Sequence, residues 1–275
     1  MKLSKEQINF YNKNGYLQIN DFFSKKEVDL LNAEIPRTIE IDSPRVIFEK
    51  KGHVRSIFAP HFVNSVFERL GKLQRLVIIA ETILKSKVYI HQYKINCKKG
   101  LESESWEWHQ DFPYWHLDDA IEKPDMVNFM VYLQDTDSLN GALLLIPGSH
   151  LGGIAKFAEK DEVQLPQADL EANSNNKYHS SLSSNIKFTV EPAQISKLSE
   201  SNSIVTASGK SGTLLLFHPN LYHASNNNMS PVDRNMILIT YNSIHNSPCN
   251  NDSPRPAFLA SREFSAIDET VQNII

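Results

Sequence analysis

The chain has 275 residues, which is enough for one large domain or two modest ones. Its 28 basic and 32 acidic side chains give a formal net charge of −4, which argues against binding to nucleic acid or to an anionic membrane. The apolar runs are too short to span a bilayer, the first residues show no targeting pattern, and two cysteines cannot make a disulfide framework. We therefore expect a cytoplasmic enzyme, monomeric or homodimeric, with a small-molecule substrate.

Residues 1–85 are expected to form a largely helical N-terminal part. A first helix is predicted to begin at Ser4, which has capping-box spacing with the glutamine three residues later. Residues 16–20 alternate between apolar and polar like a short strand, and the same capping spacing at Ser24 predicts a second helix. Apolar residues at helical spacing predict one further helix over residues 66–84.

Residues 86–264 change character, with short β-branched and aromatic runs separated by turn signals such as Asn140-Gly141. A polar insertion over residues 151–202 is expected to cover one end of a sheet. Helices followed by short strands favour an α+β, mainly β fold, a sandwich or barrel with helices on one side, in a single domain over residues 1–275. The runs that predict strands are 88–96, 127–133, 142–146, 204–207, 213–217 and 236–241.

A dense cluster of aromatic and polar residues at 106–116 contains a candidate metal site. His109 and Asp111 lie two residues apart, so an extended segment would turn both side chains to the same face. His223, which follows a predicted strand and a turn, would add a second imidazole. Two histidines and one carboxylate on one side of a cation leave positions open for co-substrates, as in non-haem Fe(II) oxygenases.

Spacing alone leaves other interpretations open. The same ligands bind Zn²⁺, His116 and Asp118 form a second pair with equal spacing, and histidines in an aromatic cluster are often simply buried and hydrogen-bonded. Arg234, eleven residues after His223, favours the iron chemistry, because a guanidinium can bind the far carboxylate of 2-oxoglutarate in a bidentate manner. Ser225 would add a hydroxyl donor to that carboxylate.

Five motifs follow one another in a recognisable order: VYIHQYKIN at 88–96, WHQDFPYW at 108–115, NGALLLIPGSH at 140–150, HAS at 223–225 and RPAFLASR at 255–262. With these motifs the chain resembles the phytanoyl-CoA dioxygenase superfamily of Fe(II)/2-oxoglutarate oxygenases. Within that superfamily it is most similar to the hydroxylases of proline and ectoine. The resemblance covers most of residues 86–264.

The resemblance implies a double-stranded β-helix core, the jelly roll of cupin-like proteins. It selects His109, Asp111 and His223 as iron ligands over the competing pair at 116 and 118. The residues that it implies at 2-oxoglutarate are Arg234, Ser225, Lys94 and Asn96. The residues that it implies at the substrate are Gln92, Trp115 and Arg255, and Tyr114 offers an additional aromatic wall for an ammonium group.

The family chemistry couples oxidative decarboxylation of 2-oxoglutarate by O₂ to oxidation of an unactivated C–H bond, with ascorbate as a supporting reductant. The expected reaction is hydroxylation of a small free amino or imino acid, releasing succinate and CO₂. The carboxylate of Asp111 argues against halogenation, because relatives with Gly or Ala there leave room for halide. An acyl-CoA is not expected, since no basic patch awaits its phosphates.

Several alternatives stay open. Desaturation, oxidative ring closure and ectoine-type hydroxylation would use the same iron. A non-catalytic protein that binds a metal or 2-oxoglutarate and a zinc hydrolase belong to other classes. Pro113-Tyr114 departs from the pattern of ectoine hydroxylase, and Ala120 replaces a glycine common to both relatives. The pocket wall therefore differs, and neither proline nor ectoine is assumed.

Overall fold

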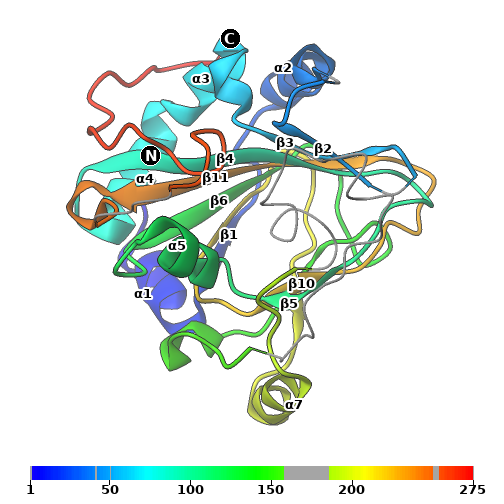
Figure 1. Ribbon diagram of the computed structural model, residues 1–275, viewed down its shortest axis with the longest axis vertical. Coiled ribbons are helices and arrows are strands. Elements are labelled where there is room, and N and C mark those ends of the chain that lie inside the picture. The colour runs from blue at the N-terminus through cyan, green and yellow to red at the C-terminus, as the bar shows by residue number, and fades with distance from the viewer. Residues whose placement is uncertain (1, 41, 50, 158–185, 250–253, 275) are drawn as a thin grey trace.

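The computed structural model describes residues 2–40, 42–49, 51–157, 186–249 and 254–274, and its described strands form two antiparallel sheets (Figure 1). The larger sheet has the strand order β1-β9-β6-β11-β4-β3-β2, and the smaller sheet has the order β5-β10-β7-β8. Two sheets built from these interleaved strands confirm the predicted mainly β fold with a jelly-roll core. None of the described helices is long and apolar enough to cross a membrane.

The strands of the larger sheet are β1 (Tyr16–Ile19), β2 (Val46–Phe48), β3 (Val54–Phe58), β4 (Val88–Lys98), β6 (Met126–Tyr132), β9 (Leu214–Phe217) and β11 (Arg234–Ser243). Those of the smaller sheet are β5 (Trp106–His109), β7 (Leu143–Leu145), β8 (Val205–Thr206) and β10 (His223–Ser225). The described α-helices are α1 (Lys5–Asn14), α2 (Lys25–Glu34), α3 (Ser65–Gly71), α4 (Gln74–Leu84), α5 (Phe112–Asp119) and α7 (Pro192–Ser201). Each of the six runs predicted as strands overlaps with one of these strands.

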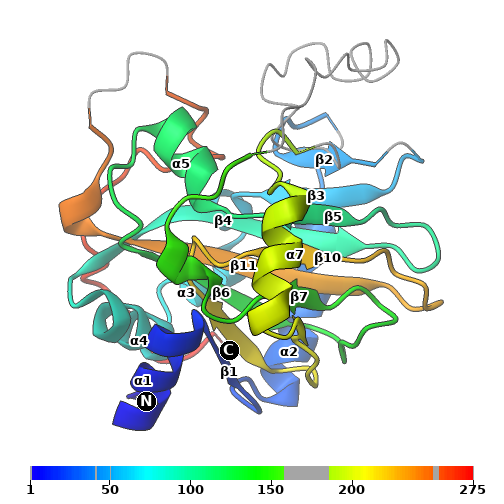
Figure 2. The same ribbon diagram turned by 90° about the horizontal axis from the view of Figure 1, so that it is seen from below.

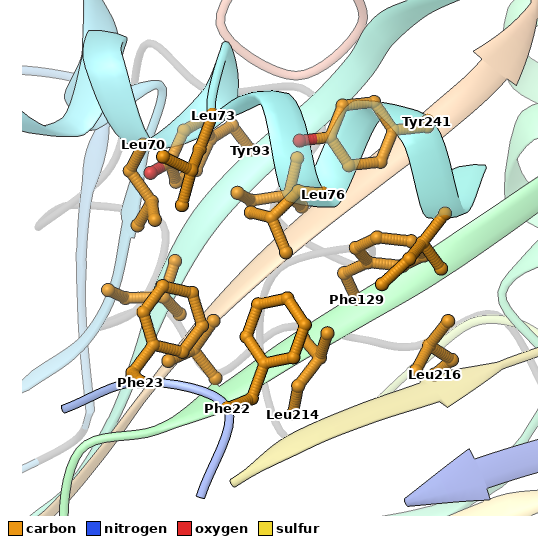
Figure 3. Packing of buried hydrophobic residues seen from close by; sticks show 14 of the residues in the cluster. Phe22, Phe23, Leu70, Leu73, Leu76, Tyr93, Phe129, Leu214, Leu216 and Tyr241 are labelled. Atoms are coloured by element: carbon orange, nitrogen blue, oxygen red, sulfur yellow. The ribbon is translucent and has the colours of Figure 1, made fainter. Parts of the chain in front are cut away.

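The larger sheet has one face turned to helices and the other to the smaller sheet. On β6, Val127, Phe129 and Val131 belong to the core under the helices, whereas Met130 belongs to a second core between the sheets. This strict alternation follows from the period of two in a β-strand. Figure 3 shows the first core, in which Leu76 of α4 packs among side chains from β4, β6, β9 and β11.

The smaller sheet is covered on its outer side by α7, as the view from below shows (Figure 2). Ile195 and Leu198 of α7 pack on a small apolar cluster that includes Tyr222, next to the start of β10. This helix lies inside the predicted insertion at 151–202, most of which falls outside the described residues. The prediction that the insertion covers one end of a sheet stays a prediction for residues 158–185.

The N-terminal part contains the two predicted capped helices and the predicted strand, together with β2 and β3 of the larger sheet. The Ser4 and Ser24 side chains both accept from the third backbone N–H of their helices, and both capping boxes are complete. The prediction of one helix over 66–84 is wrong. Leu73 has extended backbone angles (φ −64°, ψ 119°) and forms a parallel β-bridge with Val271, so α3 and α4 are separate helices.

Candidate active site

His109, Asp111 and His223 lie together between the two sheets. One potential ligand atom from each residue lies within 4.8 Å of the other two, and all three residues are buried. Asp111 is 3.9 Å from His109 Nε2 through Oδ1 and 3.8 Å from His223 Nε2 through Oδ2. Two imidazoles and one carboxylate at this separation fit one divalent cation, with positions left open for other ligands.

The backbone explains why these residues converge. His109 ends β5 and His223 begins β10, and the two residues are register partners in the smaller sheet. Asp111 does not continue the strand, because it has helical angles (φ −78°, ψ −36°) at the N-terminal end of α5, with Pro113 in the first turn. The expectation of an extended segment through both His109 and Asp111 is therefore wrong. A strand end followed by a helix start turns the carboxylate back towards the imidazoles.

Hydrogen bonds fix how the two histidines present their nitrogens. His109 Nδ1 lies 2.6 Å from the Glu107 carbonyl oxygen, and His223 Nδ1 lies 3.0 Å from the Leu221 carbonyl oxygen. A carbonyl only accepts, so each Nδ1 carries the proton and each Nε2 keeps its lone pair for a metal. Burial, together with the nearby His223, lowers the pKa of His109 to about 3, so this imidazole is neutral near pH 7.

Asp111 is oriented by two residues that the sequence did not point to. Asn128 of β6 donates from Nδ2 to Asp111 Oδ2 at 2.8 Å, and its own Oδ1 accepts from the Thr240 hydroxyl at 2.7 Å. Burial alone would raise the pKa of Asp111, but His223, Lys94 and the Asn128 hydrogen bond hold it below its ordinary value. Asp111 is therefore ionised, as a metal ligand must be.

Two cavities meet at this cluster, and Lys94, Trp106, His109 and Asp111 line both of them. The first, here called the co-substrate cavity, is also lined by Asn96, Met130, Leu143, Phe217, His223, Ser225, Arg234 and Leu238. The second, here called the substrate cavity, is also lined by Phe58, Gln92, Tyr114, Trp115, Ile186 and Arg255. A site with two compartments at one metal suits a reaction in which two organic molecules meet there.

The co-substrate cavity holds a buried cation that no acidic group balances among the described residues. Arg234 is 3% exposed, and its guanidinium donates to the backbone carbonyls of Asn140 and Gly141 at 3.3 and 2.8 Å. Burial lowers its pKa to about 10, so it stays charged near pH 7. The predicted Asn140-Gly141 turn thus holds a guanidinium, and an anion entering the cavity would neutralise it. Ser225 lies two residues after His223 on β10 and lines the same cavity.

Lys94 and Asn96 come from the face of β4 that looks towards the smaller sheet. Burial lowers the pKa of Lys94, and its ammonium lies 5.9 Å from the centroid of the Phe58 ring. Phe58 lines only the substrate cavity of the two, so Lys94 stands at the boundary between them. Asn96 accepts from the Ser56 hydroxyl through Oδ1 at 3.0 Å, and it lines the co-substrate cavity.

The substrate cavity has aromatic walls, and its lining residues are held by contacts with residues that do not line the cavity. The Tyr114 hydroxyl accepts from the Phe188 backbone N–H at 3.1 Å. Gln92 donates to the Leu259 carbonyl at 2.8 Å, which ties β4 to the C-terminal segment. Trp106 is covered by the buried Arg55, whose guanidinium carbon lies 3.8 Å from the ring centroid. Arg55 was not apparent from the sequence, because its partner lies on another strand.

The competing pair at His116 and Asp118 lies on α5, away from both cavities. His116 Nδ1 donates to the Ile121 carbonyl at 2.7 Å, and its ring stacks on Phe112. Asp118 forms an ion pair with Lys187 at 3.4 Å. Helical geometry turns these side chains to the outside of the cluster, so spacing alone was not sufficient to choose between the two pairs.

The chain is similar to several characterised proteins. L-proline trans-4-hydroxylase of Streptomyces griseoviridis is 32% identical over 94% of this chain and 92% of that protein. Ectoine dioxygenase of Bordetella bronchiseptica is 32% identical over 96% of this chain and 85% of that protein. The crystal structure of EctD from S. alaskensis with 2-oxoglutarate and 5-hydroxyectoine superposes with a TM-score of 0.81, at 27% identity over 99% of this chain and 89% of that chain.

A more distant structure shares the fold alone. The α-ketoglutarate-dependent carbocyclase SnoK is 16% identical, with a TM-score of 0.63 over 91% of this chain and 94% of that chain. The family model described as phytanoyl-CoA dioxygenase (PhyH) matches residues 11–236. By this match and by its identity to the two hydroxylating relatives, the chain belongs to the phytanoyl-CoA dioxygenase family.

Proposed function

We propose that the chain is an Fe(II)- and 2-oxoglutarate-dependent dioxygenase that hydroxylates a small free amino or imino acid. The observation that carries the proposal is the meeting of two cavities at His109, Asp111 and His223, one of which contains the buried cation Arg234. The named relatives, a proline hydroxylase and ectoine dioxygenases, support the same reaction class.

The three ligands suit Fe(II), and the co-substrate cavity suits 2-oxoglutarate. Arg234 would bind the far carboxylate with two parallel hydrogen bonds, and Ser225 would donate a third. Asn96 and Lys94 line the same cavity as Arg234 and the metal cluster. A zinc hydrolase has no use for a buried guanidinium at this place, and a protein that binds metal and 2-oxoglutarate without turnover would form no succinate.

Fe(II), 2-oxoglutarate and O₂ together supply an oxidant that can break an unactivated C–H bond, with release of succinate and CO₂. The residues of the chain would position the metal and the two organic molecules and exclude water from the site. Asn128 holds the Asp111 carboxylate, and the two backbone carbonyls hold the imidazoles, so the cluster needs little rearrangement to bind a cation. Tyr114 and Trp115 close the substrate cavity from the side of α5.

The chemistry of the substrate cavity favours an amino or imino acid. Trp106, Tyr114 and Trp115 provide aromatic faces that attract the primary or secondary ammonium group of an amino or imino acid. Lys94 at the boundary offers a positive charge to a carboxylate. A proline hydroxylase is among the similar proteins, so free proline or a close analogue is the first substrate to test.

The test is mass spectrometry of reactions that contain Fe(II), ascorbate, 2-oxoglutarate and O₂ with L-proline, pipecolate, other L-amino acids or ectoine. We expect one compound to gain one oxygen atom, with one succinate for each product molecule. A product that has instead lost two hydrogen atoms would show that the reaction is desaturation or ring closure and not hydroxylation. Iron-loaded protein that forms no succinate with any compound would contradict the proposal.

Three finer expectations stay predictions. The chain is expected to work as a monomer or homodimer, which size-exclusion chromatography with light scattering would measure. It is also expected to lie in the cytoplasm and to act as a single domain over residues 1–275. Cooperative unfolding in one transition, followed by calorimetry, would be the result expected of a single domain.

A further inference from the structure

A buried charge network joins three distant parts of the chain beside the substrate cavity. Asp119, the last residue of α5, accepts from Arg255 Nε at 2.6 Å through Oδ1 and from a terminal guanidinium nitrogen at 2.5 Å through Oδ2. His91 of β4 lies 3.1 Å from the same Oδ2 through Nε2. The Arg255 and Asp119 side chains are only 4% and 2% exposed.

This network is tied to the walls of the cavity. The His91 ring packs edge-on against Trp115 with centroids 5.7 Å apart, and Trp115 and Arg255 both line the substrate cavity. The Ser261 backbone N–H donates to the His91 carbonyl at 2.8 Å. The segment that carries Arg255 is thus held on β4 and α5 together, and Asp119 is the group that both elements share.

The network also determines which charged side chains of the cavity are available to a substrate. Burial would raise the pKa of Asp119, but the charge and hydrogen bonds of Arg255 and a hydrogen bond from His91 hold it below its ordinary value. Asp119 is therefore ionised and neutralises Arg255 with two charge-assisted hydrogen bonds. Asp111 belongs to the metal cluster, so among the described lining residues Lys94 is the cation that remains for a substrate carboxylate.

We propose that Asp119 is a positioning residue of the substrate cavity. It fixes Arg255 over the cavity and cancels its charge, so that the cavity accepts a substrate with one carboxylate and disfavours a second one. The inference rests on the proposed function, and it assigns to Arg255 the role of a neutralised wall rather than that of the main carboxylate partner.

The first test is a double-mutant cycle with D119N, R255Q and the double variant, because residues that act through each other are not additive. The readouts are the ratio of product to succinate, and kcat/KM for a monocarboxylic amino acid against its analogue with a second carboxylate. In D119N, we expect the ratio of kcat/KM to move about tenfold or more towards the dicarboxylate, since Arg255 is then uncompensated. We expect the double variant to lose this shift.

The matched control is D118N, the same substitution one residue earlier on α5, where the ion pair with Lys187 is more exposed. We expect its selectivity and its product-to-succinate ratio to equal those of the wild type. If D119N does not fold, D119E keeps the charge but displaces Arg255. We then expect less product for each succinate with unchanged preference for one carboxylate. Wild-type selectivity in D119N, a wild-type product-to-succinate ratio in D119E, or additive effects in the cycle would overturn the inference.

A second test needs no substrate and separates this inference from the proposed function. Hydrogen exchange of backbone amides at residues 254–262 is expected to rise equally in D119N and R255Q, with no further rise in the double variant. Unchanged exchange in D119N would overturn the inference. Absence of product from the wild type with every amino acid would instead count against the proposed function.

Discussion

His109 and His223 face each other as register partners on β5 and β10, and their ring centroids are 4.1 Å apart. This pairing brings together residues that are far apart in the sequence, and Asp111 completes the cluster from the start of α5. The metal centre is therefore a property of the smaller sheet and of the helix that follows β5. Changes in its ligands are expected to affect metal binding more than the fold.

Replacing Asp111 with alanine is expected to abolish product formation, a loss greater than the roughly 10–100-fold that removal of an outer hydrogen-bond partner costs. The reason is that one of three ligands is lost. Iron content after gel filtration and product yield by mass spectrometry measure the effect. H116Q serves as the control, because His116 points away from the cluster, and an equal loss in H116Q would contradict the ligand assignment.

Replacing Asn128 with alanine is expected to weaken Fe(II) binding by about 10–100-fold while leaving all three ligands in place. Asn128 is the donor that fixes Asp111 Oδ2. Titration of the metal-free protein with Fe(II) under anaerobic conditions measures the affinity. T240V removes only the hydroxyl that holds Asn128, so we expect it to weaken Fe(II) binding less than N128A does. An unchanged Fe(II) affinity in N128A would show that Asp111 needs no such support.

Arg234 is expected to set the affinity for 2-oxoglutarate. R234Q should raise KM for 2-oxoglutarate by about 100-fold, because a buried charge pair of the order of 3 kcal/mol is lost. The KM of R234K for 2-oxoglutarate should lie between those of the wild type and R234Q, since a lysine keeps the charge without the two parallel hydrogen bonds. The comparison variant is R37Q, whose arginine side chain is 72% exposed. A KM in R234Q equal to that in R37Q would exclude this role.

The stability of the metal-free protein is expected to fall with acid below about pH 6.5, in part because of His218. Burial lowers the pKa of His218 to about 3, whereas the unfolded chain has the ordinary value near 6.5. The unfolded state therefore binds more protons between these values. The stability from this depressed pKa is fully present above pH 6.5 and is lost as the pH falls towards 3, by at most about 1.4 kcal/mol per pH unit.

H218Q should flatten this dependence, because glutamine can still accept from the Asn220 backbone N–H that His218 Nδ1 now accepts. Urea unfolding of the metal-free proteins at several pH values between 4 and 7 measures the slope. Identical slopes for H218Q and the wild type would rule out a proton-linked role of this histidine.

The core under the helices is expected to dominate the free energy of unfolding. Leu76 of α4 is fully buried, so L76A should cost about 2–5 kcal/mol through lost burial and a cavity. L139A changes the same residue type where the side chain is 64% exposed, and it should stay within about 0.5 kcal/mol of the wild type. Chemical denaturation measures both, and equal effects would contradict the assignment of this core.

The strands and the metal motif were predictable because both have short-range signals. Short, nearly continuous apolar runs between turn signals mark β6 and β9, and the residues from His109 to Trp115 belong to a recognisable motif. Helix α5 gave no such signal, since its apolar residues are not confined to one face. The break at Leu73 depends on Val271, a partner about two hundred residues away that no local pattern indicates.

Supporting residues were the hardest to predict. Asp119 and Arg255 are separated by 136 positions, and only the packed fold shows that they share two hydrogen bonds. Asn128 reads as one polar residue inside an apolar strand, which is a weak indication that it has a buried partner. The metal ligands follow from residue types and order, whereas the groups that orient them follow from tertiary contacts.

The most direct test of the central claim is the formation of succinate from 2-oxoglutarate, measured with and without Fe(II) in the wild type and in D111A. The account predicts succinate only from the iron-loaded wild type, increased by the amino-acid substrate and matched by a product with one added oxygen. Succinate formation that is the same in D111A, or its absence from the iron-loaded wild type with every compound tested, would contradict the account.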